Sequence, residues 1–184
     1  MHTRRSLTVA AVLSLATGLV FAQASSEVQE RRQEIDSAAQ TTLDGLMSKD
    51  AGVRDLYERA AGYAVFTVTK GGFIVSGGGG NGVAVNKATA QRTYMRMGMA
   101  GVGLGIGGQR YNLVVLFETD DRLNKFVAGG WDSSATAEAV AGQEGVAFRS
   151  SFIDGMAIFQ VTDKGLMAWA DVSGTKFWVN EELR

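Results

Sequence analysis

Cysteine and proline are both absent from the 184-residue sequence, and histidine occurs once, as His2. The absence of cysteine excludes a disulfide scaffold and an anchor attached through a lipid-modified cysteine. Without histidine and cysteine, the chain after His2 cannot use a Ser-His-Asp or Cys-His mechanism, and it lacks the usual zinc and haem ligands. We therefore expect no catalysis of these two kinds, and no metal or cofactor.

The first 24 residues have the features of a secretory signal peptide. Arg4 and Arg5 are followed by an apolar run over residues 7–21 and by an A-x-A processing site at 22–24. The apolar run is shorter than the roughly 20 residues that a membrane-spanning helix needs. We predict that residues 1–24 are removed and that residues 25–184 form a single domain. The domain is expected in the periplasm or outside the cell, and it can lie at the surface of the envelope membrane. Thr3-Arg4-Arg5 loosely resembles a twin-arginine export signal, so both the general secretory route and twin-arginine export fit these residues.

Charge excludes one class of partner. From residue 25 onward the chain has 16 basic and 19 acidic residues, a net charge of −3. A nucleic-acid-binding domain is typically basic, with lysine and arginine clustered on one face. We therefore expect no nucleic acid partner.

Three segments have the periodicity and the end signals of helices. Residues 27–47 are amphipathic with apolar residues at three- and four-residue spacing, Asp50 can cap a second helix that ends at Gly62, and Thr119 can cap a third that ends at Gly129. We expect the first two helices to pack on a sheet. A membrane-surface helix is the alternative, but the first helix lacks the bulky aromatic residues typical of one.

The rest of the chain has the alternation and turn signals of strands. We predict turns at Thr69–Gly72, at Asn81-Gly82, which is a strong hairpin signal, and at Asp163–Gly165. The predicted fold class is α+β: a strongly curved, mostly antiparallel sheet or partial barrel, with N-terminal helices and one helix after the central strand 113–117. The expected strands cover residues 64–68, 73–75, 83–86, 91–97, 98–108, 109–117, 131–141, 152–162, 166–172 and 176–179.

One of these strands has an unusual composition. Within 98–108, glycine occupies alternate positions, with Val102, Leu104 and Ile106 between them. Because successive side chains of a strand point to opposite faces, one face of this strand is bare backbone. We expect another surface to approach that face closely, either as tight packing within the fold or as a bound ligand. The glycines concerned are Gly101, Gly103, Gly105 and Gly107.

Two glycine patterns have the spacing of the dinucleotide-binding motif but not its structural context. They are Gly77-x-Gly79-x-x-Gly82 and Gly103-x-Gly105-x-x-Gly108. That motif needs a helix directly after it, and each match is followed by strand-like sequence. We therefore do not expect a dinucleotide site.

Basic residues lie close in sequence to the glycine-rich strands. They form either a solvated outer face or a site for an anionic headgroup, because arginine can bind phosphate with two hydrogen bonds. The candidate residues are Lys70, Arg92, Arg96 and Arg110.

Several segments, taken in order, resemble the SYLF domain. They are residues 64–73, the glycines up to Val83, residues 102–109, 113–117 and 162–166. The resemblance covers residues 46–178, and it departs from the family pattern at Thr67, where family members usually have proline. A Trp-x-x-Pro stretch before the glycine strand and a Gly-Pro pair within 131–145 are missing as well.

The resemblance implies a non-catalytic module that binds anionic phospholipid or a membrane surface. In this hypothesis the glycine faces accept an acyl chain or a membrane edge, and the basic residues meet the phosphate. Actin, a ligand of eukaryotic members, is not an expected partner of an exported bacterial-type protein. The alternative is a structural or protein-interaction domain of the envelope, with no lipid ligand.

Overall fold

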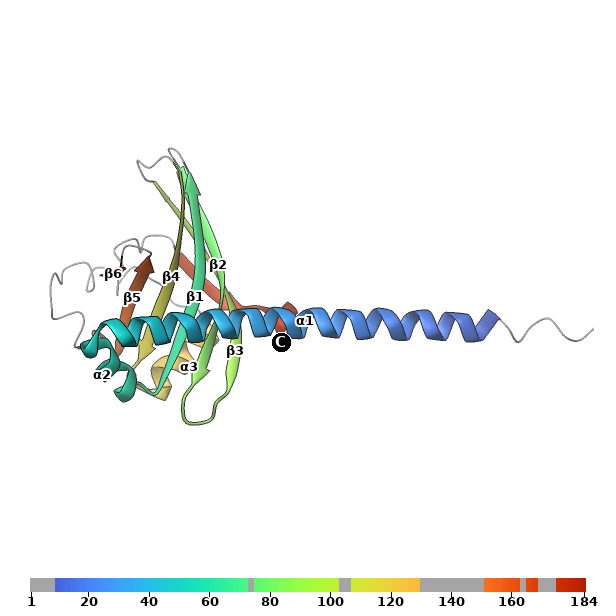
Figure 1. Cartoon of the computed structure of the whole chain (residues 1–184), viewed down its shortest axis with the longest axis horizontal. Helices are drawn as coiled ribbons and strands as arrows, with labels where there is room; N and C mark the ends of the chain where they lie inside the picture. The colour runs from blue at the N-terminus through green and yellow to red at the C-terminus, as the bar shows by residue number, and fades with distance from the viewer. Residues whose placement is uncertain (1–8, 73–74, 103–106, 130–150, 163–164, 169–174) are drawn as a thin grey trace, which may run out of the picture.

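The computed structural model describes residues 9–72, 75–102, 107–129, 151–162, 165–168 and 175–184 (Figure 1). These residues form three α-helices, seven strands and a C-terminal 3₁₀ turn. The helices are α1 (Val9–Lys49), α2 (Ala51–Arg59) and α3 (Asp120–Gly129). The strands are β1 (Gly62–Gly72), β2 (Val75–Asn86), β3 (Arg92–Val102), β4 (Gly107–Phe117), β5 (Met156–Thr162), β6 (Gly165–Ala168) and β7 (Thr175–Val179), followed by η2 (Glu181–Leu183).

All three predicted helices are present. The carboxylate of Asp50 accepts hydrogen bonds from the backbone N–H groups of Gly52 and Val53, and the hydroxyl of Thr119 accepts one from Arg122, as the capping signals predict. Helix α1 begins earlier than residue 27, and α2 ends at Arg59 rather than at Gly62. Among the described residues, no helix has an apolar stretch long enough to cross a lipid bilayer.

The strands form one antiparallel sheet in the order β6-β5-β4-β1-β2-β3-β7. Strands β1, β2 and β3 follow one another, and β4 returns to lie beside β1, which is Greek-key connectivity. The predicted α+β class with a curved, mostly antiparallel sheet is therefore confirmed. The sheet is open rather than closed into a barrel.

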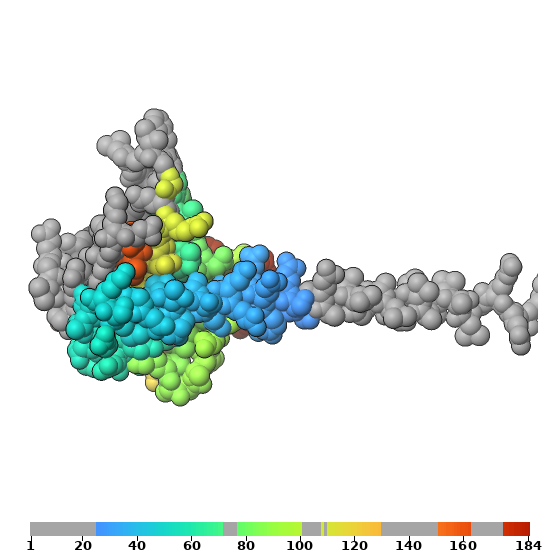
Figure 2. All heavy atoms as spheres, in the orientation of Figure 1, coloured from blue at the N-terminus to red at the C-terminus, as the bar shows by residue number. Residues whose placement is uncertain are grey.

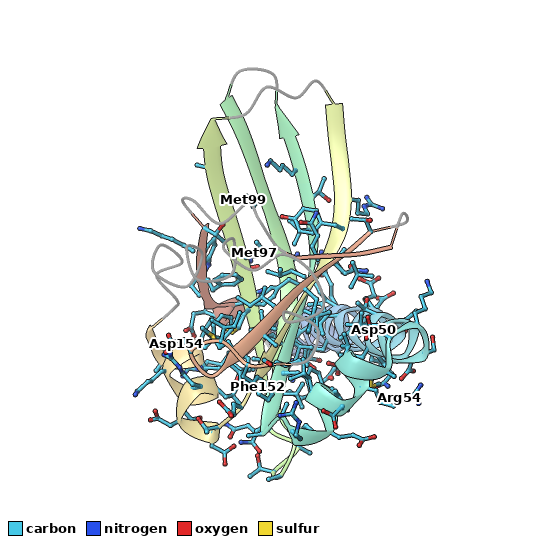
Figure 3. All side chains as sticks on the ribbon, turned by 90° about the vertical axis from the view of Figure 1, so that its left-hand side faces the viewer. Asp50, Arg54, Met97, Met99, Phe152 and Asp154 are labelled. Atoms are coloured by element: carbon cyan, nitrogen blue, oxygen red, sulfur yellow. The ribbon has the colours of Figure 1, made fainter. Side chains whose placement is uncertain are left out.

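The sheet curls around its inner face, defined here as the face that carries Phe66. Because β2 and β3 lie between β1 and β7, Phe66 and Phe177 would be about 14 Å apart on a flat sheet. Their ring centroids are 5.0 Å apart, and both rings also contact Phe126 of α3. Met97 and Met99 extend the same core along β3 (Figure 3).

The outer face, which carries Val65, packs against α1 and α2. Leu43 and Leu46 of α1 and Leu56 of α2 are buried in the same apolar cluster as Val65. The ammonium group of Lys87 donates hydrogen bonds to three carbonyl oxygens at the end of α2, those of Tyr57, Glu58 and Ala60. This cation occupies the place where a helix leaves its last carbonyls without partners.

Two predicted turns are wrong. Residues Thr69–Gly72 continue β1, and Asn81-Gly82 lies inside β2 with no positive φ at either residue. The reason is close approach: a Cβ atom at Gly82 would overlap the Val65 carbonyl oxygen and the Phe66 ring. This glycine serves the tight packing of two strands rather than a chain reversal.

The predicted strand over 98–108 is divided. Its first part ends β3 at Val102, its last part begins β4 at Gly107, and β2 and β1 separate these two strands in the sheet. β3 and β4 are three positions apart in the sheet, so one continuous strand cannot include residues of both. The alternating glycines therefore belong to the end of β3 and the beginning of β4.

The predicted strand over 152–162 begins only at Met156. Asp154 and Gly155 have φ values of 51° and 72° and form a tight reversal, closed by paired hydrogen bonds between Ile153 and Met156. This Asp-Gly pair is a two-residue hairpin turn. The predicted strand at 131–141 and most of the turn at Asp163–Gly165 lie outside the described residues.

Candidate functional site

The described strands contain basic residues and no acidic ones. All aspartates and glutamates of the described part of the chain lie in helices or connections. A sheet with charge of one sign attracts anions, because its cations have no carboxylates on neighbouring strands. The strand cations are Lys70, Arg92, Arg96, Arg110 and Lys176.

Two of the predicted phosphate ligands are held by acids within the molecule. The guanidinium of Arg92 lies 3.6 Å from the carboxylate of Asp36 on α1, and that of Arg96 lies 2.5 Å from Glu182. Arg92, Tyr94 and Arg96 all lie on the outer face of β3. These two arginines fasten α1 and the C-terminal turn to β3, so a phosphate would have to displace a carboxylate.

Tyr94 is the centre of this contact. Its hydroxyl donates a 3.0 Å hydrogen bond to Asp36, and the guanidinium of Arg32 lies over its ring. Burial, followed by the hydrogen bond and the charge of Asp36, raises the pKa of Tyr94. Burial also raises the pKa of Tyr57 and Tyr63, which lie on the same side of the sheet.

We expect the protein to lose stability at high pH, and Tyr94→Phe to reduce that loss. A phenol with a raised folded-state pKa contributes stability that is fully present below about pH 10, the ordinary tyrosine pKa. This contribution disappears as pH rises through the raised value, because the folded state then holds a proton that the unfolded state has lost. Urea unfolding from pH 8 to 11.5 measures the effect. Parallel profiles for both proteins would show that Tyr94 does not cause it.

Lys70 and Arg110 lie on neighbouring strands but on opposite faces of the sheet. In the register of β1 and β4, Lys70 is opposite Gln109 and Thr69 is opposite Arg110. Lys70 therefore shares the inner face with Phe66, and Arg110 points to the outer face. Arg110 is exposed and has no ion pair within the described part of the chain. The four predicted basic residues thus do not form one cluster.

The glycines differ by face. On the inner face of β2, a Cβ atom at Gly78 would lie 2.8 Å from the Thr69 carbonyl oxygen, so β1 approaches closely there. On the outer face, a Cβ at Gly71 would meet nothing within 4 Å, and one at Gly77 would meet only Met99 O at 3.9 Å. A close approach thus exists at glycines of β2, and the outer face is open at Gly71 and Gly77 but not at Gly98, where a Cβ would lie 3.1 Å from the Trp178 ring.

The predicted glycine positions are placed only in part. Gly101 and Gly107 lie at the ends of β3 and β4, and Gly103 and Gly105 lie outside the described residues. The expectation that a ligand contacts these four glycines therefore stays a prediction.

A groove of about 1080 Å³ lies between α1 and the outer face of β4. Arg110 and Asn112 form its sheet side next to the end of β5, and Thr41, Thr42 and Gly45 form its α1 side. In Figure 2 this region is above α1 and beside the residues of β4. Most lining residues carry hydroxyl, amide or charged groups, with the acids Glu34 and Asp50 as well as the bases Lys49 and Arg110, but more of the lining surface is apolar than polar. The groove thus combines apolar surface with charges of both signs.

Sequence reasoning missed the acidic partners of the arginines. Asp36 belongs to the polar side of the amphipathic pattern, which indicates solvent, and Glu182 follows the last predicted strand. Both pair across more than 50 residues of sequence, so no local spacing could indicate them. Lys176 was also not identified, because β7 reaches its place beside β3 only through the sheet order. Within the described residues, no three acidic or histidine side chains gather to hold a metal ion.

Comparison with known proteins gives two informative relatives. The chain is 39% identical over 155 residues to Beta cell expansion factor A of Aeromonas veronii, covering 84% of this chain and 59% of that protein. It is 31% identical over 140 residues to LAS seventeen-binding protein 3 of Saccharomyces cerevisiae (strain ATCC 204508 / S288c), covering 66% of this chain and 28% of the relative.

The chain thus spans about three fifths of the first relative and less than a third of the second. No family model matches the sequence. The two similarities are consistent with the SYLF family, which the ordered segments of the sequence resemble.

Proposed function

We propose that this protein is an exported SYLF-domain protein that acts without catalysis, as a module that binds lipid and associates with membranes. Its ligand is anionic phospholipid. The observation that carries the proposal is the charge of the sheet: its described strands bear five cations and no acid, and Arg92 and Arg96 are the two that pair with acids on α1 and η2. Arg110 is exposed, has no ion pair within the described part of the chain, and lies beside the groove between α1 and β4. A guanidinium in this position can bind a phosphate with two hydrogen bonds.

Vesicle co-sedimentation tests this proposal. The protein is purified after export, and its mass shows whether residues 1–24 have been removed. It is then mixed with vesicles of 30% phosphatidylglycerol in phosphatidylcholine, or of phosphatidylcholine alone. We expect at least about tenfold stronger partitioning to the anionic vesicles, because each basic residue near such a surface contributes about 1 kcal/mol.

The preference should shrink in 1 M salt, because the Debye length falls from about 10 Å at 0.1 M to about 3 Å. Equal binding to both kinds of vesicle, or binding to neither, would contradict the proposal. In the second case a protein partner in the envelope becomes the better candidate. The name of the yeast relative describes binding to a protein rather than to a lipid.

A further inference from the structure

We infer that the protein binds a single anionic phospholipid molecule along α1, with the phosphate at Arg110 and part of one acyl chain between α1 and strands β1 and β2. The site combines the groove between α1 and β4 with a smaller space of about 200 Å³. This space is called the slot, and its apolar walls are Ile35, Ala38, Ala39 and Val65. The inference rests on the proposed function and adds the place and the manner of binding.

The slot continues the groove. Both are lined by Glu34, Ala38 and Thr67, so they are neighbouring parts of one depression on the outer face. Figure 1 shows α1 crossing the sheet, with the strands continuing beyond the helix. In the strand register Asn112 of β4 is opposite Thr67 of β1, and Thr67 is opposite Asn81 of β2. With about 4.8 Å between strands, this row is roughly 10 Å long. One elongated ligand can therefore occupy both parts.

The groove offers the groups that a phosphate needs. Arg110 lies two residues from Asn112 on the same face, about 7 Å along β4. Thr41 of α1 lines the opposite wall. Within the described part of the chain, none of these three side chains has a hydrogen bond or an ion pair. A guanidinium binds phosphate with two hydrogen bonds, and amide and hydroxyl groups can donate to the remaining oxygens.

Two acids also line the groove, and they decide where the phosphate lies. The carboxylate of Asp50 already accepts hydrogen bonds from two backbone N–H groups of α2, and Lys49 precedes it in the chain. Glu34 lines the slot as well as the groove and has no partner among the described residues. Because a carboxylate repels phosphate, the phosphate belongs at Arg110, and the apolar slot is left for hydrocarbon.

The dimensions favour one lipid molecule rather than a bilayer surface. An apolar cavity of about 150 Å³ holds a guest the size of benzene, so the slot can hold a short hydrocarbon segment. Helix α1 is about 10 Å thick with its side chains and stands above the outer face. A flat bilayer would rest on this helix before it reached Thr67 or Asn112. The lipid therefore has to leave the bilayer at least in part, and a soluble lipid should bind as well.

A short-chain lipid tests this inference. Dihexanoyl phosphatidylglycerol, kept below the concentration at which it forms micelles, is titrated into the exported protein in a calorimeter. We expect one molecule bound per chain, at least about tenfold more tightly than glycerol 3-phosphate, because burial of two methylene groups contributes that factor. Equal affinity for the two compounds would show that only the phosphate is bound. That result would overturn the inference.

Gly45→Trp tests the place of binding. A Cβ atom at Gly45 would meet nothing within 4 Å, and tryptophan is a better helix former than glycine, so the fold should hold. The indole would lie over the preceding turn of α1, toward Thr41, and fill the groove. We expect binding of the soluble lipid to fall at least about tenfold, because the ring clashes with the ligand. The unfolding temperature should not fall.

Gly129→Trp is the matched control, because Gly129 is exposed on α3 and a Cβ there also meets nothing within 4 Å. It should bind like the unmodified protein. Arg110→Gln should weaken binding about tenfold through loss of a charged hydrogen-bonding group. Arg54→Gln, the same change at an exposed arginine of α2, should alter it less than about twofold, because Arg54 lines neither the groove nor the slot. If Gly45→Trp fails to fold, the two arginine variants decide.

The outcomes separate the two proposals. If the protein pellets with anionic vesicles but does not bind the soluble lipid, the groove is not the site and lipid binding to the membrane surface stands. Unchanged binding by folded Gly45→Trp, or equal loss in the two arginine variants, also excludes the groove. If the unmodified protein neither pellets with vesicles nor binds the soluble lipid, both proposals fail.

Discussion

Gly82→Ala is expected to destabilise the protein by about 3 kcal/mol or more, or to prevent folding, although it adds one methyl group. The added carbon would overlap the Val65 carbonyl oxygen and the Phe66 ring, which lie in the neighbouring strand and in the core. A backbone oxygen within the β1–β2 ladder cannot move without breaking strand pairing. Urea unfolding monitored by circular dichroism measures the change.

Gly77→Ala on the same strand is the matched control. Gly77 faces outward, a Cβ there would meet only Met99 O at 3.9 Å, and its φ is not positive. We expect a change of opposite sign, a gain of about 0.4–1 kcal/mol, because alanine restricts the unfolded chain more than glycine does. Equal losses in both variants would mean that β2 needs glycine for its backbone conformation rather than for close packing.

Phe66→Ala is expected to lower the free energy of unfolding by about 3–5 kcal/mol. The ring of Phe66 is fully buried and contacts Phe126 of α3 at 6.3 Å and Phe177 of β7 at 5.0 Å between centroids. Its removal leaves a cavity where the central strand β1 and the edge strand β7 meet α3. Chemical denaturation gives the magnitude, and the loss of near-ultraviolet circular dichroism reports the loosened packing.

Phe152→Ala is the control for the position of the aromatic ring, because Phe152 lies outside the inner core that Phe66 shares with Phe177. Phe152 is half-buried at the edge of the outer cluster, with Arg59 over its ring, so its truncation should cost clearly less (Figure 3). If both variants lose the same stability, the contact of Phe66 with Phe177 does not hold the curvature.

Local signals predicted the parts of the fold that depend on neighbouring residues. Asp50 and Thr119 cap helices in the structure, and the run 113–117 is a fully buried strand. These features follow from side-chain periodicity and from hydrogen bonding within a few residues. The turn prediction at Asn81-Gly82 was wrong, because glycine is favoured both in tight turns and where two strands approach closely. Local sequence does not separate these two roles.

The candidate site shows the same division. Sequence reasoning identified Lys70, Arg92, Arg96 and Arg110 as basic positions near the glycines. It could not indicate that two of them pair with acids on α1 and η2, or that the other two lie on opposite faces. Pairing depends on which distant elements become neighbours, and the face depends on the exact strand register.

The sequence alone determined which chemical groups are available: the chain has no cysteine and no proline, one histidine at His2, and 24 glycines. Its apolar periodicities also determined the α+β class. Tertiary structure alone decided where that chemistry lies. The Greek-key order makes β4 the neighbour of β1, and the packing of α1 and η2 beside β3 places acids next to Arg92 and Arg96 while Arg110 stays exposed. The physical reason is that charge and backbone exposure act over distances in space, and these are set by long-range strand pairing rather than by spacing along the chain.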